Sequence, residues 1–326
     1  MSLLEVADLR VHHRGDPIVA GVDLTVEPGE ALGLAGESGC GKSTTALAIM
    51  KLLPPALEPS GTITLRPPGV DDPVRIDRRT ERGMQLVRWR HVSLVFQGAM
   101  NALDPVQRVD RQILEAIRLH EPKAGKLGGR IAELLKTVGL TSTHGRAYPH
   151  QLSGGQRQRA MIALALACRP ALVIADEPTT ALDVIMQAQV LELLERLREE
   201  LGLALILISH DLAVLAESCD RLAVMYAGRI VESGPAAQVF RSPQHPYTKR
   251  LIDSLPVIGG ARGVADPIPG APPDPRDPPA GCTFRPRCPY AADACLEEPA
   301  LREVAPAQAA ACHFAPGLHD SSWAGR

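Results

Sequence analysis

Residues 36–43 read Gly36-Glu37-Ser38-Gly39-Cys40-Gly41-Lys42-Ser43 and match the pattern G-x-x-x-x-G-K-[ST] of phosphate-binding loops. An apolar run at 31–35 precedes them and predicts a buried strand, and residues 44–50 predict a helix. The glycines let backbone N–H groups converge on an anion, and the helix start adds unpaired amides. Lys42 can reach the β- and γ-phosphates of a nucleotide, and the Ser43 hydroxyl can ligate Mg²⁺. The alternative is a chance match in a Gly-rich turn.

An acidic pair, Asp176-Glu177, follows the apolar run at 171–175, which predicts a fully buried strand. An aspartate there can hold the Mg²⁺ shell, and the adjacent glutamate can polarise an attacking water. Solvated acids at a strand end are an equally good interpretation of this pair alone. Another buried strand, predicted at 203–208, ends at Ser209-His210.

A second Gly-rich helix start lies at Leu152-Ser153-Gly154-Gly155-Gln156. A serine and two glycines at this position form another anion-binding nest. A single nucleotide site that already has its own phosphate loop has no use for it. Two such nests in one chain therefore indicate a site shared between two chains.

The remaining pattern alternates strands and helices, which indicates an α/β fold with a largely parallel sheet and ligands at strand carboxyl ends. Further strands are predicted at residues 3–11, 22–26, 61–65 and 92–96, and helices at 109–120, 130–138, 154–168 and 186–201. Residues 67–80 read as a surface loop, and the Pro- and Gly-rich residues 256–280 as a linker.

Composition limits the function classes. A length of 326 residues favours one large domain plus an appendage. With 35 Lys and Arg against 37 Asp and Glu, the chain has no overall basic character, so nucleic acid is not an expected partner. The N-terminus does not resemble a signal peptide, and the apolar runs are too short to span a bilayer. We therefore expect a cytoplasmic protein whose membrane role, if any, depends on partner subunits.

In order along the chain, the phosphate loop, Gln97, residues 152–156, Asp176-Glu177, Ala181-Leu182-Asp183 and His210 resemble the ATP-binding-cassette ATPases. The resemblance covers about residues 1–235. It implies a cassette with a parallel-sheet phosphate-loop core, an antiparallel β subdomain and a helical insertion at about 98–168. A Cys-rich C-terminal extension, residues 236–326, would follow.

The resemblance also implies roles for single residues, with ATP and Mg²⁺ as ligands. Glu177 would be the general base, His210 would contact the γ-phosphate, and Gln97 would contact Mg²⁺ and water and respond to a transmembrane subunit. Ser153, Gly155 and Gln156 would bind the nucleotide of a partner ATPase, and Asp183 would lie in the loop crossing to it. The remaining implied contacts are Gly36, Ser38, Gly39, Cys40, Gly41, Lys42, Ser43 and Thr44 to the nucleotide, and Ser43, Gln97 and Asp176 to Mg²⁺.

One position departs from the family pattern. The family places an aromatic residue against adenine upstream of the phosphate loop, whereas this chain has Val11-His12-His13-Arg14 there. His13 has the right spacing and can stack on a base, although less well than tyrosine. A surface turn without this role is the alternative.

Two further stretches, residues 96–105 and 242–248, resemble the ATPases of dipeptide, oligopeptide and nickel importers. Read without the resemblance, the second is a Pro-rich turn before a helix at 248–255. The resemblance implies a second related ATPase, as a heterodimer, with two permeases and an external binding protein. The chain would then lie peripherally at the cytoplasmic face of the membrane and power peptide import, with a nickel or metal-chelate cargo as the alternative.

The extension contains a cysteine series, Cys282, Cys288, Cys295 and Cys312, with the spacing C-x5-C-x6-C-x16-C. Four thiolates suit zinc or an iron–sulfur cluster, and the spacing is not that of a C-x2-C zinc ribbon. Similar tails in peptide-importer ATPases imply a [4Fe–4S] cluster, with zinc as the alternative. Four unligated cysteines in a loose tail are the remaining interpretation.

Two other functions are compatible with a cassette. ATPases of this kind in DNA repair or translation usually carry a long coiled coil or two cassettes, whereas only 55 residues separate Gln97 from Ser153 here. A non-catalytic module that only binds ATP is the other possibility, and the complete set of motifs argues against it.

Overall fold

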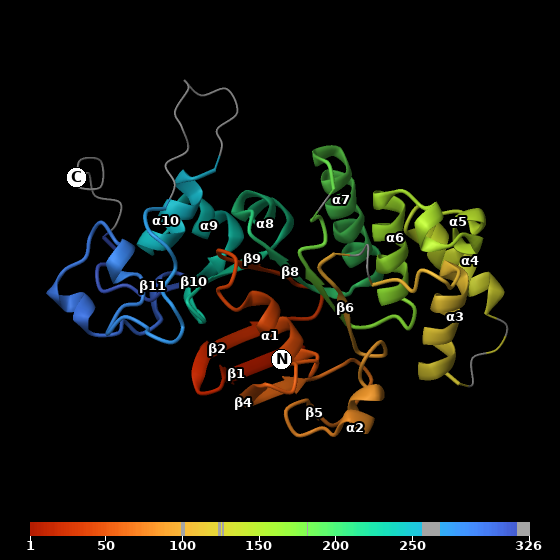
Figure 1. The fold of residues 1–326 in the computed structure, drawn as a ribbon, viewed down its shortest axis with the longest axis horizontal. Coiled ribbons are helices and arrows are strands. Elements are labelled where there is room, and N and C mark those ends of the chain that lie inside the picture. The colour runs from red at the N-terminus through yellow and green to blue at the C-terminus, as the bar shows by residue number, and fades with distance from the viewer. Residues whose placement is uncertain (99–101, 123–124, 126, 181, 256–267, 318–326) are drawn as a thin grey trace. The chain divides into compact units, whose positions relative to one another are not determined.

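The computed structural model describes residues 1–98, 102–122, 125, 127–180, 182–255 and 268–317 (Figure 1). Its contacts divide the chain into two compact units. The first unit comprises Met1–Leu4, Val26–Glu30 and Thr64–Ile208, and the second comprises Glu5–Thr25, Ala31–Ile63 and Ser209–Arg326. Each unit is formed by segments that are distant in the sequence. The predicted domain boundary at residue 235 stays a prediction.

A parallel sheet is the centre of the first unit. Its strands are β6 (Val92–Val95), β7 (Leu172–Asp176) and β8 (Ala204–Ser209), with β7 in the middle. The residues of β7 and β8 are all buried, which explains why both strands read as continuous apolar runs. The parallel register aligns the carboxyl ends of the strands, where β7 ends at Asp176 and β6 is followed by Phe96 and Gln97.

Helices make up most of the remainder of the first unit. They are α2 (Glu81–Gln85), α3 (Val109–His120), α4 (Gly128–Thr137), α5 (Ser142–Arg146), α6 (Gly154–Ala165) and α7 (Val184–Leu201), with the 3-10 turn η1 (Pro149–Gln151). The helix α7 begins at an Asp183 N-cap and ends at Gly202, whose φ of 63° suits a helix C-cap. The short strand β5 (Val74–Arg75) pairs with the end of β4 (Leu57–Leu65).

The second unit contains a mixed sheet in the order β3-β9-β10-β12-β11. The strand β3 (Ala31–Ala35), which leads into the phosphate loop, lies parallel to β9 (Arg221–Tyr226), and the other pairs are antiparallel. The outer strands are β10 (Arg229–Pro235), β12 (Gln308–Ala310) and β11 (Arg302–Ala305). The register pairs Glu232 with Ala310. The C-terminal extension therefore continues the same sheet as the strand before the phosphate loop.

The described residues of the second unit also form a smaller β-layer, four α-helices and two 3-10 turns. The layer contains β2 (Asp16–Val26), β1 (Leu4–His13) and β4, in that order. The helices are α1 (Lys42–Ile49), α8 (Leu212–Ser218), α9 (Ala236–Arg241) and α10 (Pro246–Asp253), together with the 3-10 turns η2 (Arg285–Arg287) and η3 (Asp293–Leu296). Among the described residues, no helix is both long enough and apolar enough to cross a bilayer.

Several predicted elements need correction. The strand predicted at 22–26 begins at Asp16, because residues 14–15 form a tight turn and β2 runs on from it. The predicted helix 154–168 ends at Ala165, and the predicted loop 67–80 contains β5. Residues 256–267 of the predicted linker lie outside the described residues, and residues 268–280 form no helix or strand.

Candidate functional site

The phosphate loop adopts a conformation that only glycine tolerates at its first position. Gly36 has a φ of 148°, and a Cβ there would lie 2.2 Å from the backbone oxygen of Met225. A Cβ would thus lie far inside van der Waals distance of Met225, because β9 runs directly beside the loop at this point. At the other end, Gly41 is the N-cap of α1, and no side chain caps this helix. The start of α1, with the positive end of its dipole, is therefore placed at the end of the phosphate loop.

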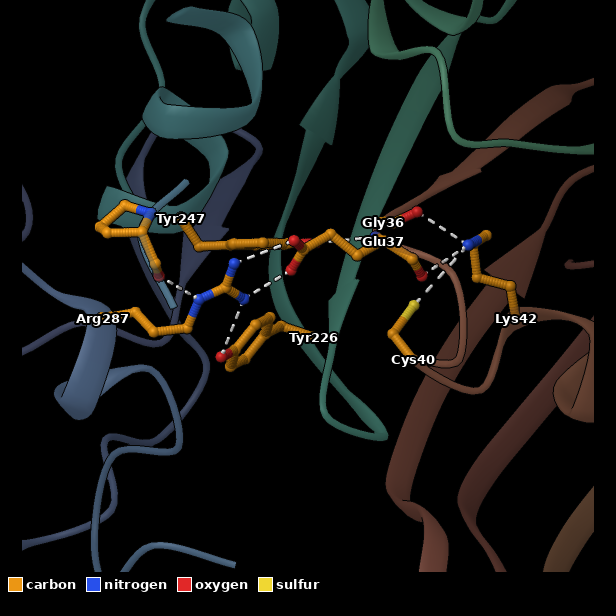
Figure 2. A network of polar contacts seen from close by, with 8 residues as sticks. Gly36, Glu37, Cys40, Lys42, Tyr226, Tyr247 and Arg287 are labelled. Carbon is orange, nitrogen blue, oxygen red and sulfur yellow. Dashed lines mark hydrogen bonds and ion pairs between the residues drawn. The ribbon is translucent and has the colours of Figure 1, made fainter. Parts of the chain in front are cut away.

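Lys42 lies within the loop rather than in solvent. Its side chain is buried, and its Nζ donates to the backbone oxygens of Gly36, at 2.7 Å, and Glu37, at 3.0 Å. A weaker contact, 3.8 Å long, reaches Cys40 Sγ (Figure 2). Burial raises the pKa of the Cys40 thiol, which keeps it protonated beside the ammonium group. The ammonium group is thus held by loop atoms at the centre of the predicted phosphate site.

The outer side of the loop faces other parts of the second unit. A cavity of about 390 Å³ adjoins residues 37–40, and its walls include Ile18, Gly228 and prolines of the segment 272–279. This volume is within the range of small-molecule sites. His13 is the last residue of β1 and is partly exposed, but it does not line this cavity. Its stacking on adenine stays a prediction.

Glu177 has an unusual backbone that several hydrogen bonds hold in place. Its φ of 45° is left-handed, which costs an ordinary residue about 1–2 kcal/mol. Its N–H donates to the oxygen of Ile208, at 3.0 Å. Its carboxylate accepts from Gln97 Nε2, at 2.7 Å, and from Thr180 Oγ1, at 2.9 Å. Backbone strain at a positioned carboxylate is common at functional sites.

The first unit thus brings Gln97 and Glu177 into hydrogen-bond contact, and the roles assigned to them stay predictions. Asp176 is buried at the end of β7, next to this pair in sequence. Ser43 and Thr44 lie in the first turn of α1, partly exposed, and His210 is exposed directly after β8. Among the residues proposed for Mg²⁺, Gln97 and Asp176 belong to the first unit and Ser43 to the second. Each carries an oxygen donor of the hard type that Mg²⁺ prefers.

The second Gly-rich stretch forms a self-capped helix start in the first unit. Ser153 is the N-cap of α6, and its Oγ accepts from the Gln156 N–H, at 3.3 Å. The Gln156 side chain accepts in turn from the Ser153 N–H, at 2.9 Å, which completes a capping box. Ser153 is exposed, whereas Gly155 is buried and a Cβ there would meet the end of the Met186 side chain. A second chain can reach Ser153 from solvent.

The crossing loop is partly described. Asp183 is exposed and caps α7 by accepting from the Met186 N–H, at 2.9 Å. Leu182 precedes it, and Ala181 lies outside the described residues. The two residues after Asp183, Val184 and Ile185, are apolar and highly exposed.

The four cysteines of the extension carry free thiols in the second unit. Burial raises the pKa of Cys288 to about 12, and the other three cysteines add to the shift. The Cys282 N–H donates to the oxygen of Cys295, at 3.0 Å. Thiols are suitable ligands for soft metals. Within the described residues, however, no three His, Cys, Asp or Glu side chains are grouped so as to hold a metal.

Sequence reasoning missed a second set of residues around the loop. Glu37, an unspecified position of the motif, binds Tyr247 and Arg287 of the extension (Figure 2). A charged side chain in a loop built to receive phosphate was the available signal, as was an arginine next to the cysteine series. Neither signal predicts which residues are in contact, because the bonded residues are about two hundred positions or more apart in the sequence.

Comparison with known proteins agrees with this geometry. The family model described as ABC transporter matches residues 19–180, and the model described as oligopeptide/dipeptide transporter, C-terminal region, matches residues 231–295. A probable peptide ABC transporter ATP-binding protein of Sinorhizobium fredii is 45% identical over 95% of this chain and 94% of its own. A dipeptide transport ATP-binding protein of Haemophilus influenzae is 44% identical over 93% of each chain.

Solved structures give the same result. A dimeric ATP-binding cassette, MJ0796, in a post-hydrolysis state with ADP and phosphate, superposes with a TM-score of 0.61 and 26% identity. The match covers 72% of this chain and 98% of that one. The chain therefore belongs to the ATP-binding-cassette (ABC) ATPase family, in the branch that carries the oligopeptide/dipeptide transporter C-terminal region.

Proposed function

We propose that this chain hydrolyses ATP to power the import of peptides across the cytoplasmic membrane through partner permeases. The observation that carries the proposal is the phosphate loop, in which a buried Lys42 ammonium group lies beside an uncapped helix start. A triphosphate entering this loop offers Lys42 a stronger, charged acceptor than the two carbonyl oxygens that it now binds. The relatives compared above are named for peptide or dipeptide transport.

The chemistry assigned to Glu177 follows from its hydrogen bonds. Its carboxylate oxygen accepts from Gln97 and Thr180, and these two hydrogen bonds orient the carboxylate. In this role it accepts a proton from the attacking water while Gln97 helps to hold that water. Bound Mg²⁺, held by Ser43, Gln97 and Asp176, would neutralise charge on the phosphate oxygens. His210 contacts the γ-phosphate in this proposal.

A complete site needs a second ATPase chain. Ser153 presents its hydroxyl to solvent at the start of α6, and Gly155 behind it allows Met186 to pack closely. We assign this stretch, with Gln156, to the γ-phosphate of the nucleotide in the partner, and Asp183 to the loop that crosses to it. A second, related ATPase is the partner that the resemblance implies, which makes the assembly a heterodimer.

Two permeases and an external binding protein complete the proposed importer, and the chain lies at the cytoplasmic face. Exposed apolar side chains in the chain after β6, Phe96 at 41% and Val106 at 81% exposure, are the docking residues that we propose for a permease. Peptides are the proposed cargo. A nickel or metal-chelate cargo is not favoured, because the relatives compared are named for peptides.

The cysteine series belongs to this proposal as a separate, structural element. We assign Cys282, Cys288, Cys295 and Cys312 to a [4Fe–4S] cluster, or else to zinc, on the strength of four thiols in one extension. No step of ATP hydrolysis depends on it. Iron, sulfide and zinc analysis of the anaerobically purified protein tests the assignment, and a protein lacking all three would remove it.

The function is tested by reconstituting the chain with its permeases, second ATPase and binding protein in vesicles. We expect ATP hydrolysis that rises when a peptide is supplied with the binding protein, together with peptide uptake. Nickel chelates in place of peptide provide the cargo control. Co-purification with nucleic acid and no permease, or hydrolysis indifferent to peptide, would contradict the proposal.

A further inference from the structure

Glu37, the second residue of the phosphate loop, is held by the C-terminal extension through both its backbone and its side chain. Its N–H donates to the hydroxyl of Tyr247, at 2.8 Å. Its carboxylate receives two hydrogen bonds from Arg287, from Nη1 to Oε2 at 2.7 Å and from Nη2 to Oε1 at 3.0 Å. All three residues belong to the second unit. Figure 2 shows the three side chains converging on one end of the loop.

Arg287 is a fixed support rather than a surface charge. Only 5% of its side chain is exposed. Its Nε donates to the backbone oxygen of Pro269, at 2.9 Å, and its guanidinium lies over the ring of Tyr226, 5.8 Å from the centroid. A bidentate, largely buried arginine–carboxylate pair is stronger and more directional than an exposed ion pair. The position of Glu37 is therefore set by the segment before Cys288.

Tyr247 lies in the segment 242–248, which resembles the ATPases of peptide importers. None of the cassette motifs lies in this segment. The ring of Tyr247 packs against Tyr226, with centroids 4.5 Å apart, and against Phe284, at 5.5 Å. The N–H groups of Gln244 and His245 both donate to the buried carboxylate of Glu232 on β10. These bonds anchor the start of α10 to the sheet and thereby place the Tyr247 hydroxyl at the loop.

The loop atoms that these residues hold are next to those that bind Lys42. Lys42 Nζ donates to the carbonyl oxygens of Gly36 and Glu37, which flank the N–H that Tyr247 binds. A shift of the backbone at Glu37 would move both acceptors of the lysine. We propose that Arg287 and Tyr247 are positioning residues for the nucleotide site, and that the extension presets the phosphate loop through Glu37.

This inference extends the proposed function, since the site positioned is the ATP site. The experiment compares the full-length chain with Arg287→Met, Glu37→Gln and Tyr247→Phe, and measures the Kd for MgATP. We expect binding about three- to tenfold weaker in Arg287→Met, with smaller losses in Glu37→Gln and Tyr247→Phe. Arg287→Lys, which keeps the charge but loses the bidentate geometry, is expected to recover part of the loss.

The matched control is Asp8→Asn, which breaks the ion pair of Asp8 with Arg10 in the same unit and lies outside the lining of the cavity beside the loop. We expect wild-type MgATP binding in this variant. Because Arg287 and Glu37 act as one pair, the double variant Glu37→Gln/Arg287→Met should bind no more weakly than Arg287→Met alone. A purely stabilising role would instead lower the melting temperature and leave the Kd of the folded fraction unchanged.

Hydrogen exchange of residues 36–43 in the nucleotide-free chain gives a readout that does not require ATP. Faster exchange in Arg287→Met, but not in Asp8→Asn, supports the inference even if the wild-type chain proves not to bind ATP, which would refute the proposed function alone. If Arg287→Met does not fold, Glu37→Gln decides, because it leaves the contacts of Arg287 with Pro269 and Tyr226 in place. Wild-type exchange and wild-type Kd in the folded variants would overturn the inference.

Discussion

The two Gly-rich helix starts of this chain differ in how they are capped and in what holds them in place. The loop before α1 has a glycine N-cap, no side chain to cap it, and a buried lysine bound to its carbonyl oxygens. The start of α6 satisfies its amides locally, with the Ser153 hydroxyl and the Gln156 amide in a capping box. The first is held from outside by Tyr247 and Arg287, and the second is exposed to solvent.

Under the proposed function, this difference separates a site for a ligand from a site for a partner chain. A helix start without a side-chain cap is a favourable position for an anion, and here tertiary contacts hold the loop that leads into it. A capped, exposed start is stable without a ligand and can approach a second molecule without rearranging. Variants of the two stretches should therefore fail differently, the first in nucleotide binding by a single chain and the second only in an assembly of two.

The largest effect is expected from Lys42→Ala. It removes the ammonium group from the centre of the loop, and MgATP binding should fall by at least about a hundredfold, since charge-assisted bonds to phosphate are lost. Equilibrium binding of MgATP measures this. Lys136→Ala, which removes an exposed lysine on α4, is the control and should bind normally. Binding within twofold of wild type in Lys42→Ala would remove the phosphate loop from the proposed site.

The next largest effect concerns Glu177→Gln. The amide keeps the size of the side chain but cannot accept a proton, so turnover should fall by about 10²–10⁴-fold while MgATP binding persists. Single-turnover hydrolysis with the reconstituted complex measures the change. Glu192→Gln, on the exposed face of α7, is the matched control. Hydrolysis at the wild-type rate in Glu177→Gln would exclude this residue as the base.

How much the sequence predicts depends on whether a feature is local. The buried strands β3, β7 and β8 and the helix after Lys42 follow from runs of apolar residues and a loop motif that lie close together in the chain. The helix start at Ser153 is equally local, but it was predicted as an anion-binding nest and not as the capping box that the structure has. The strand β12 was not predicted, because it is three residues long and its pairing with β10 joins positions such as Glu232 and Ala310.

The candidate site shows the same limit. The motif predicts that Lys42 serves a phosphate site, but the support of Glu37 by Arg287 depends on how the extension folds back. The left-handed backbone of Glu177 has no local signal either, since it follows from the bond of its N–H to Ile208. The cysteine series gives the number of candidate ligands but not their arrangement in space. The described residues do not group these cysteines so as to hold a metal.

A third prediction tests the external support of the phosphate loop by pH. Burial lowers the pKa of His245 to about 3, and its Nδ1 accepts from the Tyr247 N–H at the start of α10. The unfolded chain, with an ordinary histidine, binds the proton between about pH 6.5 and pH 3, whereas the folded chain does not. The stabilisation from neutral His245 is thus fully present above pH 6.5 and is lost as the pH falls.

The nearest buried acid opposes this effect. Burial raises the pKa of Glu232, whose carboxylate accepts from the His245 N–H, so Glu232 favours the folded state as pH falls. His245→Asn separates the two, because asparagine keeps a cap acceptor without the titration. We expect the melting temperature of wild type to fall more steeply from pH 7 to pH 5 than that of His245→Asn. Parallel curves would show that His245 does not control this range.

The smallest effect on stability is expected from Ser153→Ala, and it is the sharpest test of the difference between the two helix starts. Loss of the N-cap should lower the free energy of unfolding by about 1 kcal/mol, measured by denaturant unfolding. Thr141→Ala is a matched control, since Thr141 caps α5 with the same kind of capping box. Both variants should bind MgATP normally as single chains. Only Ser153→Ala should reduce turnover in the assembled ATPase pair, because only its hydroxyl is assigned to the nucleotide of the partner. Equal turnover in the two variants would mean that Ser153 does no more than cap its helix, and the chain would then have one nucleotide-binding helix start instead of two.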